Sequence, residues 1–168
     1  MTELTSDDFR IKIDCTDMEV LSGADAPIVC RIWMEFSGAE FPEAGWWDFP
    51  GSVLGSMTTA LKEISTGEPE AEAFFFDGPY RLEMRVLGAF SEGRGPTGAK
   101  NREVRLLMVC DRPDPPEAEA VVDVPISVLA RSVEAALLQL MAEARRRGLT
   151  GAGVEVLGDI MSALQRIE

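Results

Sequence analysis

The sequence predicts a single α+β domain over residues 1–168: a mainly antiparallel sheet of five or six strands, one inserted helix and two C-terminal helices packed on one face. Two patterns predict this class. Several segments alternate apolar and polar side chains with a period of two, whereas the segments after residues 50 and 125 repeat apolar side chains at helical spacing. A chain of 168 residues can bury a core without disulfides or metals.

The first two predicted strands each have one apolar and one polar face. In "FRIKID" (9–14) and "IVCRIWMEF" (28–36), every second residue is apolar. This alternation is typical of antiparallel strands with one face on a core and the other toward water. Trp33 lies on the polar face between two charged residues, where it either packs across the sheet or binds a partner.

The inserted helix and a hairpin follow. Apolar residues recur at helical spacing over residues 53–64, and Gly67 supplies a stop. The next segment, "FFFDGPYRLEM" (74–84), contains the pair Asp77-Gly78 between two runs of strand-forming residues. Both positions of such a pair tolerate positive φ, so the sequence predicts a tight two-residue hairpin turn.

The last part of the chain changes from strands to helices. "REVRLLMVC" (102–110) and "AVVDV" (120–124) complete the predicted sheet, and the glycine-rich stretch 88–101 is expected to be a loop. A helix is expected from Pro125, and a final helix over residues 154–167. The first of these helices carries a long apolar stripe: Ile126, Leu129, Val133, Ala136, Leu137, Leu140, Met141 and Ala144.

Charge narrows the choice of partners. The net charge is −13, and residues 1–93 hold 18 acidic and 6 basic side chains. Nucleic acid and anionic membranes are disfavoured as partners, because both are bound through cationic groups. A basic protein is the expected partner, with solubility alone as the other interpretation of the charge. No run resembles a signal peptide or membrane span, so we expect a cytoplasmic protein.

Residues for catalysis or metal binding are sparse. The chain has no histidine, so the usual general base and metal ligand are missing, and we expect no cofactor. Cys15, Cys30 and Cys110 are widely spaced and are expected to be buried free thiols. Asp48 and Asp77 are the carboxylates to consider for acid–base catalysis. Their other interpretations are structural: a helix cap for Asp48 and a turn residue for Asp77.

The stretch "GWWDFP" (45–50) supplies the candidate binding residues. Neighbouring side chains of an extended segment point to opposite faces, so Trp46 and Trp47 cannot both enter one core. We expect Trp46 to point outward, with nearby carboxylates as an acidic rim. The predicted partner-binding residues are Trp33, Glu40, Glu43, Trp46 and Asp48.

Two motifs also carry a family resemblance. "GWWDFPGSVLGSM" (45–57), followed by "FFFDGPYRLEM" (74–84), resembles a group of small acidic bacterial proteins that includes WapI-type immunity proteins of polymorphic toxin systems. The resemblance covers residues 27–90. The shared positions are Trp47, Asp48, Phe49, Val53, Leu54, Phe76, Asp77, Gly78 and Pro79.

The resemblance and the charge together favour a non-enzymatic binding module. The resemblance implies an immunity protein, which would neutralise a cognate toxin by covering a basic active-site surface with an acidic one. The first alternative is a structural or regulatory homodimer joined through the C-terminal helices, suggested by the apolar stripe over residues 126–144. The second is a carboxylate-dependent enzyme.

Overall fold

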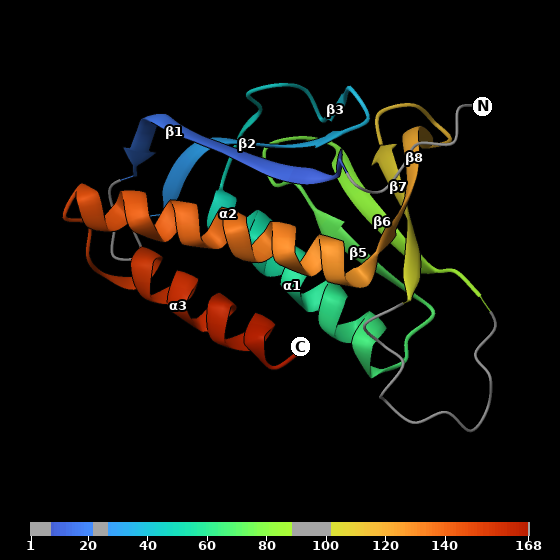
Figure 1. Ribbon diagram of the computed structural model, residues 1–168. Helices are drawn as coiled ribbons and strands as arrows, with labels where there is room; N and C mark the ends of the chain where they lie inside the picture. Colours follow the sequence, from blue (N-terminus) through green and yellow to red (C-terminus); the bar gives the residue numbers. More distant parts are fainter. Residues whose placement is uncertain (1–7, 22–26, 89–101, 168) are drawn as a thin grey trace.

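The computed structural model of the chain describes residues 8–21, 27–88 and 102–167 (Figure 1). Most of the predicted loop at 88–101 lies outside these residues. The described elements are, in chain order, β1 (Arg10–Val20), β2 (Ile28–Phe36), β3 (Ala39–Phe41), β4 (Trp47–Asp48), α1 (Pro50–Thr66), β5 (Glu70–Phe74), β6 (Tyr80–Val86), β7 (Glu103–Cys110), β8 (Glu117–Pro125), α2 (Ile126–Arg146) and α3 (Ala152–Gln165).

The described strands form two antiparallel sheets of four. Sheet A has the order β1-β2-β3, with β4 also paired to β2, and sheet B has the order β5-β6-β7-β8. The α+β class is confirmed, but the strands are divided between two sheets and do not form the single sheet of five or six that we expected. Alternation identifies a strand and its buried face but not its neighbours. The α1 helix separates the two groups in sequence, and each group pairs within itself.

The three helices cover one face of the sheets and supply much of the core. The α1 helix contacts β2 and β5, α2 contacts β1 and β8, and α3 packs on the other two helices (Figure 1). The predicted stripe of α2 is buried almost throughout in this core. None of the helices in the described residues combines the length and apolar character needed to cross a membrane.

Candidate functional site

Asp48 is the centre of the contacts between the two predicted motifs. Its side chain is fully buried at the end of β4. Among the described residues, four N–H groups donate to its carboxylate: the Trp46 indole and the backbones of Phe49, Phe76 and Asp77. Oδ1 lies 2.7 Å from Phe49 N and 3.1 Å from Phe76 N. Oδ2 lies 2.9 Å from Phe76 N, 3.2 Å from Asp77 N and 3.3 Å from Trp46 Nε1.

This geometry corrects the expectations for Asp48. Phe49 occupies the N-cap position of α1, and the Asp48 carboxylate accepts hydrogen bonds from the β5–β6 hairpin. Because the side chain is 0% exposed, Asp48 cannot belong to an acidic rim. Both oxygens accept hydrogen bonds from the chain's own N–H groups. Asp77 is exposed in the hairpin, and its backbone supplies one of those donors.

The hairpin turn differs from the predicted two-residue turn. The paired strands end at Phe74 and resume at Tyr80, and Phe75 N donates to Tyr80 O at 3.0 Å. Gly78 lies in this wider turn, outside the group of glycines with positive φ. It serves a close approach instead, because a Cβ at this position would lie 2.7 Å from Trp46 Cζ2. The absence of a side chain lets the indole lie close to the turn backbone.

Trp46 and Trp47 do point to opposite faces, but the prediction of which one faces outward was wrong. Trp46 packs against the core and makes an edge-to-face contact with Tyr80, with ring centroids 5.1 Å apart. Trp47 is opposite Arg31 in the β2–β4 register, and the guanidinium carbon lies 5.4 Å from its ring centroid. The register decides the outcome, because it places Asp48 opposite the buried Cys30 and Trp47 on the outer side.

The outer face of sheet A is the best candidate for a binding surface. Its core-facing residues on β2 are fully buried, whereas the alternate residues of that strand are partly exposed. We define the tryptophan face as six of the outward residues that the strand registers bring together: Lys12, Arg31, Trp33, Glu35, Glu40 and Trp47.

Polar contacts hold the tryptophan face in place. Trp33 is opposite Lys12, and its indole N–H donates to Glu35 Oε1 at 3.2 Å. The other Glu35 oxygen, Oε2, lies 3.5 Å from Lys12 Nζ. Arg31, which covers Trp47, donates to the β1 carboxylates of Asp14 at 3.0 Å and Asp17 at 2.8 Å. Each indole is therefore positioned by a charged neighbour.

An acidic groove adjoins the tryptophan face beside the β2–β3 turn. It has a volume of about 350 Å³, and Asp8, Arg10, Glu35 and Glu40 contribute its charged side chains. Glu40 is exposed and lies opposite Glu35 in the strand register. Glu43 is exposed in the loop between β3 and β4. Of the five predicted binding residues, Glu40 and Glu43 are exposed and Trp33 is partly exposed. Trp46 is also partly exposed but packs against the core, and Asp48 is buried.

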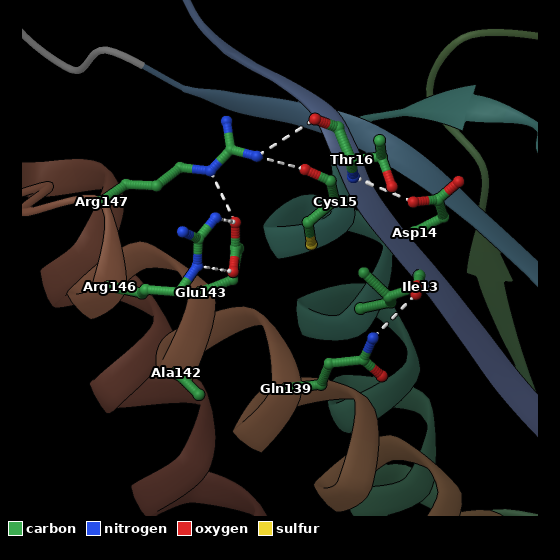
Figure 2. A pocket seen from close by; sticks show the side chains of 9 residues that line it. All are labelled: Ile13, Asp14, Cys15, Thr16, Gln139, Ala142, Glu143, Arg146 and Arg147. Atoms are coloured by element: carbon green, nitrogen blue, oxygen red, sulfur yellow. Dashed lines mark hydrogen bonds and ion pairs between the residues drawn. The ribbon is translucent and has the colours of Figure 1, made fainter.

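A second groove lies between β1 and the C-terminal end of α2 (Figure 2). It is open, with a volume of about 740 Å³. Arg147 reaches across it and donates to the carbonyl of Cys15 at 2.5 Å, while its Nε donates to Glu143 at 2.6 Å. Hydrogen bonds from Arg146 and then Arg147 lower the pKa of Glu143 to about 2.

Side chains of α2 and of Arg147, its C-cap residue, donate hydrogen bonds to carbonyl groups of β1 and of the residue before it, in part along this groove. Ser132 donates to the carbonyl of Phe9 at 3.2 Å, and Gln139 donates to that of Ile13 at 2.8 Å. Arg147 continues the row, since it bonds three carbonyls at the β-bulge that follows Asp14. These hydrogen bonds cover the edge of β1, which would otherwise be open to pairing with a strand of another chain. The groove thus has a structural explanation.

Sequence reasoning missed this row of donors. Ser132, Gln139 and Arg147 are spaced by seven and eight residues, which places them on one side of a helix. This spacing, beside the apolar stripe of α2, was the sequence signal from which the row of donors could have been predicted. In the described residues, no three His, Cys, Asp or Glu side chains are grouped so that they could hold a metal ion.

Comparisons with protein-family models, with curated proteins and with solved structures gave no match. The resemblance to WapI-type immunity proteins therefore stays a prediction from two motifs.

Proposed function

We propose that this chain is a non-enzymatic binding module, an immunity protein that neutralises a cognate bacterial toxin in the cytoplasm by covering a basic surface. The observation that carries the proposal is the tryptophan face, where two partly exposed indoles lie among carboxylates. Tryptophan is enriched among the residues that contribute most to protein–protein binding energy.

The contacts of the two indoles support a binding role. The Trp33 ring is fixed by its hydrogen bond to Glu35, and Trp47 lies under Arg31. Side chains that are ordered before binding lose less conformational entropy when a partner docks. The same contacts leave part of each ring uncovered, so both can anchor a partner.

The charge around the face supports a basic partner. Carboxylates outnumber cations on and beside it, with Asp8, Asp14, Asp17, Glu35 and Glu40 against Arg10, Lys12 and Arg31. This excess steers a cationic protein toward the face and accelerates its association at low salt. Carboxylates that occupy a phosphate-binding active site would block substrate entry, which makes occlusion a sufficient mechanism.

The first test is protection of living cells. A candidate toxin, to be sought among the genes that neighbour the one for this chain, is expressed in a sensitive bacterium with and without the chain, and colony counts are compared. We expect survival with the wild type and its loss when Trp33 and Trp47 are both replaced by alanine. Phe74→Ala, which removes an exposed aromatic from sheet B, serves as the matched control and should still protect. Killing in the presence of the wild-type chain would contradict the proposal.

The second test measures binding by the purified proteins. Loss of the Trp33 indole should weaken the complex about 30-fold, the equivalent of about 2 kcal/mol for a central aromatic anchor. Glu40→Lys with Glu43→Lys should slow association mainly at low salt. The control is Glu117→Lys with Glu119→Lys on β8, which makes the same charge change on exposed residues of sheet B. Equal effects from both pairs would contradict a role for this face.

Two structural observations bear on the alternative functions. The apolar stripe proposed for a homodimer is buried within the chain, where it covers both sheets. Of the two carboxylates considered for catalysis, Asp48 accepts hydrogen bonds from the chain on both oxygens, and Asp77 is exposed in the hairpin turn.

A further inference from the structure

Two of the three cysteines form a close pair on the core side of sheet A. Cys15 and Cys30 lie on the neighbouring antiparallel strands β1 and β2, and their Sγ atoms are 3.8 Å apart. The register passes from the pair Asp14–Arg31 into a β-bulge, and this places the two thiols side by side. Both are free thiols. The pair faces away from the tryptophan face and is independent of the proposed function.

The two thiols differ in their access to solvent. Cys15 lines the open groove of Figure 2 and is 8% exposed, whereas Cys30 is 0% exposed. The hydrogen bond between them lowers the pKa of the Cys15 thiol and raises that of Cys30. A small reagent that enters the groove therefore meets Cys15 first, and Cys15 is also the thiol that ionises more readily.

We propose that Cys15 and Cys30 are a redox pair, in which a hydroperoxide oxidises Cys15 and Cys30 converts the product to a disulfide. The Cys15 thiolate attacks one peroxide oxygen, the O–O bond breaks, and hydroxide leaves to be protonated to water. Cys15 becomes a sulfenic acid. Cys30 then attacks that sulfur, the S–O bond breaks and an S–S bond forms. The leaving hydroxide takes the Cys30 thiol proton and departs as a second water. Two thiols and one hydrogen peroxide thus give one disulfide and two waters.

The geometry allows this bond within the fold. A disulfide requires the sulfurs to approach from 3.8 Å to about 2.0 Å, and rotation of side chains on two paired strands can supply such a movement. The bond would join β1 to β2 beside the bulge. A thiol such as glutathione would reverse it by thiol–disulfide exchange. Cys110 lies on β7 in the other sheet and serves as an internal control.

The test uses the full reduced chain and hydrogen peroxide in small excess. After treatment the chain is denatured, its remaining thiols are alkylated, and intact mass and peptide mapping are measured. We expect alkylation to fall from three thiols to one, with the remaining label on Cys110 and a Cys15–Cys30 link in the map. Dithiothreitol should restore all three. Three labels after treatment, oxidised Cys15 without a link, a bond to Cys110 or a bond between chains would overturn the proposal.

Single variants test the order of the steps, with their folding checked by circular dichroism. In Cys30→Ser, dimedone should trap a sulfenic acid on Cys15, because the resolving thiol is gone. In Cys15→Ser, the buried Cys30 should give no adduct. An adduct on Cys30 alone would overturn the assignment of Cys15 as the attacked thiol. The wild-type result does not depend on either variant.

Discussion

Replacing Asp48 tests whether the two sequence motifs are held together by one buried carboxylate. In Asp48→Ala, the Trp46 indole and the backbone N–H groups of Phe49, Phe76 and Asp77 lose their acceptor. A buried donor without a partner costs about 1 kcal/mol or more, so the four together should lower the free energy of unfolding by about 4 kcal/mol. That is a large fraction of the 5–15 kcal/mol typical of a folded domain.

Asp48→Asn separates the effect of hydrogen bonds from that of side-chain volume. Its single carbonyl oxygen can replace Oδ2 and keep three donors, which leaves the N–H of Phe49 without an acceptor. The expected loss is therefore about 2 kcal/mol, between wild type and alanine. Asp77→Asn, on the exposed turn, is the control and should change stability by less than about 0.5 kcal/mol.

The assay is urea denaturation followed by far-ultraviolet circular dichroism, which does not depend on tryptophan fluorescence. Free energies extrapolated to water are compared at equal m-values. A loss of less than about 1 kcal/mol for Asp48→Ala would refute the reasoning. An Asp77→Asn loss equal to that of Asp48→Asn would also refute it, because the effect would then come from the turn and not from the buried carboxylate.

Three further substitutions test other contacts. Gly78→Ala should cost about 1–3 kcal/mol by urea denaturation, because its Cβ would lie 2.7 Å from the Trp46 ring; Gly158→Ala, with open space around its Cβ, is the control and should be neutral or stabilising. Glu143→Gln should lower the free energy of unfolding at neutral pH. Because folding lowers the Glu143 pKa from 4.5 to about 2, the difference in free energy of unfolding between variant and wild type should shrink as pH drops through this range. A difference that does not change with pH would contradict this reasoning. Arg147→Met should cost about 1–2 kcal/mol and speed hydrogen exchange in β1, since three carbonyls lose a donor; unchanged exchange there would contradict the role of α2 at this edge.

The sequence contained enough information to assign the buried and the outer face of a strand, but not to assign which strands pair with each other. Alternation placed Ile32 in the core and Trp33 on the outer side, and both positions are confirmed. The choice between Trp46 and Trp47 depended on how β4 pairs with β2, which no local pattern encodes. The division of the strands into two sheets was missed for the same reason.

Long-range contacts account for the other misses. Asp48 adjoins a helix start in sequence, so a cap was the natural expectation. Its main partners, however, are backbone groups 28 and 29 residues away, brought close only by the packing of the hairpin against β4. Gly78 resembled a turn glycine but is needed for the contact with Trp46. The family resemblance includes Asp48 and Gly78, which hold the fold together. The binding hypothesis depends on other residues, those of the tryptophan face.

Hydrogen–deuterium exchange of the chain, alone and with the candidate toxin of the protection test, tests the proposed binding face most directly. We predict slower exchange on binding over β1 to β4, centred on the strand that carries Trp33, with β5 to β8 unchanged. Slower exchange confined to sheet B, or none at a concentration of toxin candidate that should saturate the chain, would contradict the account.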